Sequence, residues 1–285
     1  MNNYIIKKYP IDNISIFEIE NFISEDLYKK IKKNFNNYLS DVFDKRQLLD
    51  KKNSKYCFNS RMKIYEKIKN KYIEIKELDD IVQSKEFCRF LFKKFFFEIL
   101  KSRKNNLSQL LRVFKIPNLK KFNERKNDKI SELDDHGHQK IVRKFNKRFR
   151  LLDLIYNDIE VTTEYSYIFN KGKIVPHTDD VDKIFSLMLY FPQFDTDLKS
   201  ELKNQEKKIG TVFWNSTKKN FNNKHLEGSS EKKFEDENKK ILILPFEGKR
   251  LFGFIKNDLS WHSVRQFDLN EKYVRYSINI NFRLT

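Results

Sequence analysis

The second half of the chain, from about residue 151, is a succession of short β-type runs. Each run is rich in β-branched and aromatic residues, and polar, turn-like segments separate it from the next. Several short strands with no long helix between them are typical of an antiparallel sandwich or barrel. The runs cover residues 160–169, 183–191, 210–214, 240–245, 250–256 and 273–282.

The first third of the chain has a different pattern, which predicts mainly helices. Alternating apolar and polar residues predict a strand over residues 14–22. Ser24 then provides a good N-cap, and apolar residues follow it at helical spacing, so we expect a helix over residues 24–39. Two further helical regions are expected over residues 61–78 and 84–102, with their apolar stripes in the core.

Two polar stretches interrupt these elements. Residues 40–60 are expected to be irregular, and residues 215–239 are expected to form a long mobile loop. The length of the chain, 285 residues, is sufficient for one large core. We therefore expect a single α+β domain over residues 1–285. Its expected parts are an N-terminal strand with supporting helices (1–102), a basic insertion or lid (103–150) and a β-strand core (151–285).

The chain is strongly basic, with a formal net charge of +18. Lysines outnumber arginines by 45 to 13, a bias that an A/T-rich genome produces without any ligand. The charge is nevertheless uneven, because residues 101–150 hold 16 Lys/Arg against 5 Asp/Glu. An anionic partner for this segment therefore stays open beside the compositional explanation.

No segment of the sequence predicts targeting to a membrane. Residues 1–10 lack an apolar run of signal-peptide length. The most apolar helical stretch, residues 87–100, is too short and too charged to cross a bilayer. The two cysteines, Cys57 and Cys88, form no CxxC motif, so we expect reduced thiols. These features predict a cytoplasmic protein without a membrane span.

Two histidines and one aspartate have the spacing of a metal site. His177 and Asp179 are two residues apart, so on an extended strand their side chains share one face. A distant histidine, for which His262 is the candidate, completes three ligands on one side of a metal ion. This is the ligand set of non-haem Fe(II) oxygenases, which leaves positions open for substrate and O2. By contrast, His136 and His138 lie in a polar stretch with no third anchor, and we expect a surface loop there.

The last β-type run has two chemically different faces. Arg275, Ser277, Asn279 and Asn281 alternate with apolar residues, so they share one side of the strand. An arginine that faces inward is costly unless it meets an anion, and a carboxylate that accepts two parallel hydrogen bonds satisfies it best. We therefore expect Arg275, with help from Ser277, to anchor an acidic co-substrate. Lys272, in an expected hairpin turn, is the weaker alternative anchor.

At these residues the chain resembles the Fe(II)/2-oxoglutarate-dependent dioxygenases, in particular the prolyl-4-hydroxylase-like branch. The family's HxD…H…RxS pattern is present as His177-Thr178-Asp179, His262 and Arg275-Tyr276-Ser277. The resemblance is strong over residues 160–285 and weaker over residues 14–100. It implies a double-stranded β-helix, a jelly-roll or cupin-like barrel, with the N-terminal helices packed on one sheet.

The resemblance also implies roles for individual residues. The implied iron ligands are His177, Asp179 and His262. Arg275 is the implied salt-bridge partner of the distal carboxylate of 2-oxoglutarate, and Ser277 assists it. Tyr190 and Tyr167 occupy positions where relatives place tyrosines that contact the co-substrate.

The implied reaction uses Fe(II), with 2-oxoglutarate as co-substrate and O2 as oxidant; ascorbate is a candidate reductant. It hydroxylates a C–H bond of a protein side chain, a glycan or a small metabolite, with release of succinate and CO2. The primary substrate stays unknown, and the basic composition keeps an anionic substrate among the candidates. The oligomeric state is also left open.

Two alternatives remain. In the first, the same chemistry acts on nucleic acid, which residues 101–150 would bind. It is not favoured, because the nucleic-acid demethylase branch has a second arginine six residues after the first, and that position is Asn281 here. In the second alternative, the β-strand core is a non-catalytic binding module. An intact set of inward-facing ligands argues against it.

Overall fold

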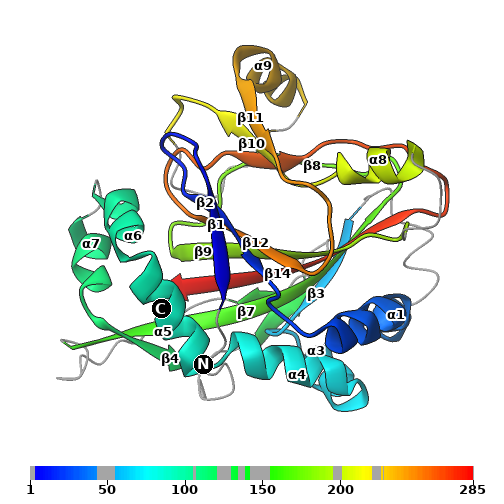
Figure 1. Cartoon of the computed structure of the whole chain (residues 1–285), viewed down its shortest axis with the longest axis horizontal. Coiled ribbons are helices and arrows are strands. Elements are labelled where there is room, and N and C mark those ends of the chain that lie inside the picture. The colour runs from blue at the N-terminus through cyan, green and yellow to red at the C-terminus, as the bar shows by residue number, and fades with distance from the viewer. Residues whose placement is uncertain are drawn as a thin grey trace.

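The computed structural model is built around two main sheets, with a layer of helices beside the larger one (Figure 1). It describes residues 4–43, 55–104, 107–120, 130–133, 139–141, 155–194, 201–219, 226 and 228–284. The larger sheet lies in the middle, the helices α1 and α3 to α7 lie along its lower and left sides in Figure 1, and the smaller sheet lies above it. Among the described residues, no helix is long and apolar enough to cross a membrane.

The larger sheet has eight strands in the order β1-β2-β12-β9-β14-β7-β3, with β4 paired in parallel to β7. All the other pairings in it are antiparallel. The strands are β1 (Ile5–Tyr9), β2 (Ile16–Glu20), β3 (Lys55–Asn59), β4 (Ile116–Lys120), β7 (Tyr156–Phe169), β9 (Lys183–Phe191), β12 (Arg250–Ile255) and β14 (Val274–Leu284).

The smaller sheet has four antiparallel strands in the order β11-β10-β13-β8. From β7 onward the chain passes repeatedly between the two sheets, because β7, β9, β12 and β14 belong to the larger one. The prediction of a mixed fold with large antiparallel sheets is confirmed; closure of the two sheets into a barrel stays a prediction. The strands of the smaller sheet are β8 (Ile174–His177), β10 (Val212–Asn215), β11 (Lys239–Ile243) and β13 (His262–Val264).

The alternation of side chains along β9 and β14 divides the core into two parts. One face of both strands, which includes Leu189 and Ile278, packs against the helices. The other face of β9, with Met188 and Tyr190, packs against the smaller sheet, where Phe213 is a neighbour. Each of these side chains is at most 6% exposed, so both faces of the sheet are dry in its centre. This burial on both sides explains why residues 183–191 are almost continuously apolar.

The helices cover the outer face of the larger sheet. Helix α1 begins after Ser24, whose hydroxyl accepts a hydrogen bond from the backbone N–H of Leu27, as the sequence predicts. Phe35 of α1 stacks on Tyr276 of β14 with 4.8 Å between ring centroids. The helices are α1 (Glu25–Val42), α3 (Lys63–Lys71), α4 (Ile73–Val82), α5 (Lys85–Lys94), α6 (Phe96–Arg103) and α7 (Leu107–Val113).

The structure corrects the predictions made for the two polar stretches. Within residues 40–60, predicted to be irregular, β3 pairs with β7 and its three central residues are buried. Within residues 215–239, predicted to be a mobile loop, residues 229–237 form the helix α9 (Ser229–Glu237), and its Phe234 packs on Trp261 at 4.7 Å between ring centroids. Both stretches gain their structure from contacts with distant parts of the chain, which local composition does not reveal.

The basic segment 103–150 is described only in part. Besides α7 and β4, it contains a two-stranded sheet of β5 (Ile130–Leu133) and β6 (Gln139–Ile141). The predicted loop that contains His136 and His138 lies outside the described residues. The short helix α8 (Glu201–Lys207) follows β9 in the chain. Division of the chain into parts at residues 102 and 150 stays a prediction.

Candidate metal and co-substrate site

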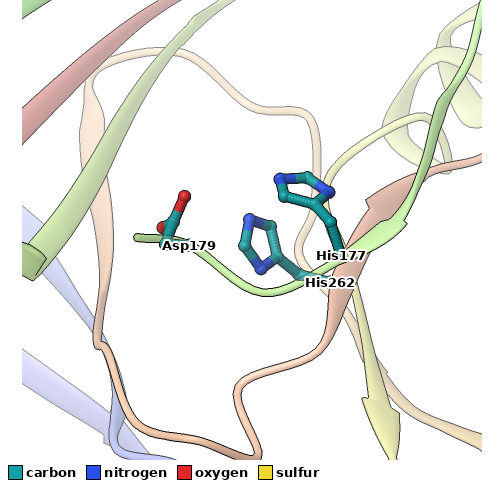
Figure 2. A group of neighbouring side chains, drawn as sticks. All are labelled: His177, Asp179 and His262. Carbon is teal, nitrogen blue, oxygen red and sulfur yellow. The ribbon is translucent and has the colours of Figure 1, made fainter. Parts of the chain in front are cut away.

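His177, Asp179 and His262 lie together between the two sheets. One potential ligand atom from each residue lies within 4.8 Å of the other two, and Figure 2 shows the three side chains converging. They are 9%, 5% and 9% exposed, respectively. A buried carboxylate next to two imidazoles is costly for a metal-free structural role, whereas it is the ordinary environment of a bound divalent cation.

The pairing of β8 with β13 brings the two histidines together. His177 and His262 are cross-strand partners in this antiparallel pair, and their ring centroids are 4.3 Å apart. The ring of Phe254, on the larger sheet, lies 4.8 Å from that of His262 and supports it from the other side. Asp179 follows His177 by two residues, at the point where the chain leaves β8.

The hydrogen bonds of the two histidines fix which ring nitrogen can bind a metal. Nδ1 of His177 lies 2.9 Å from the carbonyl oxygen of Val175, and Nδ1 of His262 lies 3.0 Å from that of Ser260. A carbonyl oxygen only accepts, so each Nδ1 must carry the proton. In the neutral imidazoles Nε2 therefore carries the lone pair, the arrangement in which metal-binding histidines are usually held.

The carboxylate of Asp179 is held by side chains from strands of the larger sheet. The hydroxyl of Ser186 on β9 donates to Oδ2, and the ammonium of Lys183 lies 2.5 Å from Oδ1. Oδ1 of Asn281 on β14 is a second acceptor for the Ser186 hydroxyl, at 3.2 Å. Each carboxylate oxygen has a further lone pair, so these bonds leave Asp179 able to coordinate a cation.

The charges around Asp179 keep it ionised. Burial acts to raise the pKa of its carboxyl, but the charges of Lys183 and, when they are protonated, of the two histidines outweigh burial and hold the pKa well below its ordinary value. The carboxylate is thus already in the charged form that a metal ligand requires.

Arg275 is the other unusual charge between the sheets, since it is only 2% exposed. Its Nε donates to the carbonyl oxygen of Ile209 at 2.8 Å, and Nη1 donates to the hydroxyl of Ser277 at 3.3 Å. The guanidinium carbon lies 5.0 Å from the ring centroid of Tyr190 and 4.8 Å from that of Phe246. Burial lowers the pKa of Arg275, although the guanidinium remains a cation at neutral pH.

No carboxylate of the described part of the chain lies within 4.0 Å of the Arg275 guanidinium. A guanidinium has five N–H donors, and the partners of Arg275 here are the carbonyl oxygen of Ile209 and the hydroxyls of Ser277 and Tyr190. The remaining donors and the uncompensated charge suit a carboxylate ligand. The alternative anchor, Lys272, is exposed in a turn and so lacks this environment. The turn is not the predicted hairpin, because β13 and β14, which it connects, belong to different sheets.

The two tyrosines predicted to contact the co-substrate differ in their placement. Tyr190 shares the inner face with Arg275, and its hydroxyl lies 2.8 Å from that of Thr211. Tyr167 lies on the opposite, helix-covered face of β7, where its hydroxyl donates to the carbonyl oxygen of Phe35 at 3.0 Å. The prediction for Tyr167 is therefore wrong. Side chains alternate along a strand, and Ser166 and Ile168 are the residues of β7 that share the face of Arg275.

Several supporting residues were not predicted to have a role. Alternation placed Asn281 on the same strand face as Arg275, but nothing local links Asn281 or Ser186 to Asp179. Lys183 comes four residues after Asp179, but outside a helix this spacing does not predict that the two side chains are in contact. Arg103 and Arg283, which contact the loop of Asp179, come from distant elements. Only the tertiary structure shows these pairings.

No protein-family model matches the chain, and no curated protein matches it. Among solved structures it is similar to a prolyl hydroxylase from Trichoplax adhaerens in complex with a peptide of the hypoxia-inducible factor oxygen degradation domain. That match has 11% identity and a TM-score of 0.41, and it covers 94% of this chain and 83% of that one.

Two shorter matches are a prolyl-4-hydroxylase from Pseudomonas putida (12% identity, TM-score 0.24) and a non-heme alpha-ketoglutarate-dependent carbocyclase from nogalamycin biosynthesis (6% identity, TM-score 0.28). Each covers 43% of this chain, which spans about half the length (48%) of each of these two proteins. At such TM-scores these likenesses carry no argument, so the site must be judged on its own geometry.

Proposed function

We propose that this chain is an Fe(II)- and 2-oxoglutarate-dependent oxygenase that hydroxylates a C–H bond. The observation that carries the proposal is the buried group of His177, Asp179 and His262, with both imidazoles held in the tautomer that exposes Nε2. Two histidines and one carboxylate on one side of a metal are typical of non-haem iron oxygenases. The polar residues of this group fit a divalent cation and have no other evident purpose in an apolar core.

The proposed co-substrate is 2-oxoglutarate, and Arg275 is its proposed anchor. Its buried guanidinium, held by Ile209 and flanked by the rings of Tyr190 and Phe246, is oriented before any ligand arrives. Ser277 would donate its hydroxyl to the same carboxylate. Such a preorganised arginine favours an anion over a neutral group by its charge, and its planar fork matches a carboxylate with two parallel hydrogen bonds, so dicarboxylates are the ligands to test first.

Bound iron would supply the activation of O2, and the chain's own residues have simpler tasks. His177, Asp179 and His262 would hold the ion, and the surrounding apolar residues, Phe213 and Phe254 among them, keep water away from it. The products beside the hydroxylated substrate would be succinate and CO2. Ascorbate is the proposed reductant that keeps the metal ferrous between turnovers.

The primary substrate is proposed only by class: a protein side chain, a glycan or a small metabolite. The nucleic-acid alternative gains no support from Arg283, the next arginine after Arg275, because it is bound to Asp180 and Asp182 at 2.8 Å each. Most of the basic segment that would bind nucleic acid lies outside the described residues.

The test is a succinate-release assay with Fe(II), ascorbate and 2-oxoglutarate. We expect slow release by the wild-type protein without a primary substrate, and faster release when peptides, anionic glycans, lipids or nucleotides include the right class. The double variant His177→Ala, Asp179→Ala should release none. The control Asp236→Ala, which removes an exposed carboxylate on α9, should match the wild type.

Two results would contradict the proposal. Succinate release that persists in the double variant would show that the reaction does not need this group. Failure of the folded wild-type protein to bind Fe(II) or Co(II) would favour a non-catalytic binding module instead.

A further inference from the structure

The loop that carries Asp179 is tied down by two arginines from distant parts of the chain. It connects β8 to β9 and spans residues 178–182. It contains no regular backbone ladder of its own, so its conformation depends on side chains that reach it from outside. The position of the Asp179 carboxylate depends on that conformation.

Arg103, in the last turn of α6, is the first of these side chains. It is fully buried, at 0% exposed. Nη1 donates to the carbonyl oxygen of Val181 at 2.9 Å, and Nη2 donates to the carbonyl oxygen of Lys183. The fork of one guanidinium thus holds two backbone carbonyls on either side of Asp182, just after the carboxylate of Asp179.

Arg283, near the end of β14, is the second. Its Nη1 lies 2.8 Å from Oδ2 of Asp180 and 2.8 Å from Oδ1 of Asp182. The backbone N–H of Leu284 also donates to the carbonyl oxygen of Asp182 at 2.8 Å. The side chain of Arg283 is 12% exposed, that of Asp182 is 22% exposed and that of Asp180 is 40% exposed, so solvent screens the pair with Asp182 less than the pair with Asp180.

The charge pattern of the loop explains why such contacts are needed. Asp179, Asp180 and Asp182 place three carboxylates within four residues, and they repel one another where water is scarce. Arg283 pairs with two of them, and Lys183 pairs with the third. Without Arg283 the loop would relieve the repulsion by moving outward, and Asp179 would move with it.

We propose that Arg103 and Arg283 are positioning residues that set the location of Asp179 for metal binding. The inference rests on the proposed function, since it takes Asp179 as a metal ligand. Neither arginine touches the ligand group itself; both act through the loop. Residues that orient metal ligands typically change metal affinity by about 10- to 100-fold when they are replaced.

The experiment is a Co(II) titration, followed by visible absorption, which reports both the affinity and the coordination geometry. We expect Arg283→Met and Arg103→Met to bind Co(II) about 10- to 100-fold more weakly than the wild type, with an altered spectrum. Arg283→Lys, which retains the charge without the fork, should lie between. The control Arg250→Met loses ion pairs with Glu18 and Glu247 outside this loop and should bind as the wild type does.

Urea denaturation of the metal-free variants separates positioning from stability. A variant that is less stable yet binds Co(II) with wild-type affinity and spectrum would overturn the inference and leave the proposed function intact. Absence of Co(II) binding in the wild type would overturn both. If Arg283→Met does not fold, Asp182→Asn removes one of the two ion pairs, and wild-type binding by it and by Arg283→Lys would overturn the inference.

Discussion

His177 and His262 are directly opposite one another on the antiparallel strands β8 and β13, with 4.3 Å between their ring centroids. The register of this short pairing therefore decides whether a metal site exists at all. A slip by one residue would turn one imidazole to the other face of the sheet. The backbone carbonyls of Val175 and Ser260 then complete the orientation of the two rings.

Metal binding should stabilise the fold, because an ion that binds only the folded chain shifts the unfolding equilibrium. At a Co(II) concentration about 100-fold above the dissociation constant, the free energy of unfolding should rise by about 2.7 kcal/mol. Urea denaturation with and without Co(II) measures this difference. The rise should disappear in His262→Ala and persist in Asp236→Ala; an equal rise in His262→Ala would place the metal at another site.

Replacement of Arg275 should weaken co-substrate binding without affecting the metal. Hydrogen bonds to a charged group contribute about 1.5–3 kcal/mol, so Arg275→Met should raise the dissociation constant of 2-oxoglutarate by about 10- to 150-fold. Calorimetric titration of the Co(II)-loaded protein measures this change, and a separate Co(II) titration should show no difference. The control Lys272→Met should leave 2-oxoglutarate binding unchanged. A loss in Lys272→Met instead would make the exposed lysine the anchor.

Loss of the hydroxyl group should affect a different property at each of the two tyrosines: stability at Tyr167 and co-substrate affinity at Tyr190. Tyr167→Phe removes the bond to the carbonyl oxygen of Phe35, and it should lower the free energy of unfolding by about 1 kcal/mol with no change in 2-oxoglutarate affinity. Tyr190→Phe removes a hydroxyl beside Thr211 on the face of Arg275, and it should change that affinity severalfold. Urea denaturation and calorimetric titration of both variants test this. Weaker co-substrate binding in Tyr167→Phe alone would contradict the placement of the two faces.

Asp79 should make stability depend on pH. Its carboxylate is buried beside the hydroxyls of Tyr65 and Thr163, and burial raises its pKa to about 6. The folded protein binds this proton more tightly than the unfolded chain does. The contribution of Asp79 to stability is therefore fully present below about pH 4 and is lost as the pH rises through 6.

An asparagine at position 79 does not titrate, so the stability of Asp79→Asn should lack the pH-dependent loss that Asp79 causes in the wild type. Its free energy of unfolding, relative to the wild type, should be about 2–3 kcal/mol higher at pH 8 than at pH 4, because two units of pKa correspond to that energy. Urea denaturation at both pH values gives the comparison. Asp80→Asn, an exposed neighbour on the same helix, should show a much smaller change. An equal change in both variants would mean that burial of Asp79 is not the cause.

Local patterns alone determined much of this fold. The apolar run over residues 183–191 has the same bounds as β9, and Ser24 caps α1 as predicted. The predicted helix over residues 84–102 divides at Phe95 into α5 and α6, and its predicted start coincides with Ser84, the N-cap of α5. Such signals are short-range, because hydrogen bonds within a turn and side-chain periodicity involve residues close in sequence.

The candidate site divides in the same way. The sequence by itself selected His177, Asp179, His262 and Arg275, since few residue types bind metal ions or buried carboxylates and alternation placed them on strand faces. Only the tertiary structure decided that Tyr167 faces the helices and that Arg103 and Arg283 hold the loop of Asp179. Those outcomes depend on which strands become neighbours and on their register. Strand neighbours and register are set by how the whole chain buries its apolar side chains, and a local sequence pattern carries no information about that.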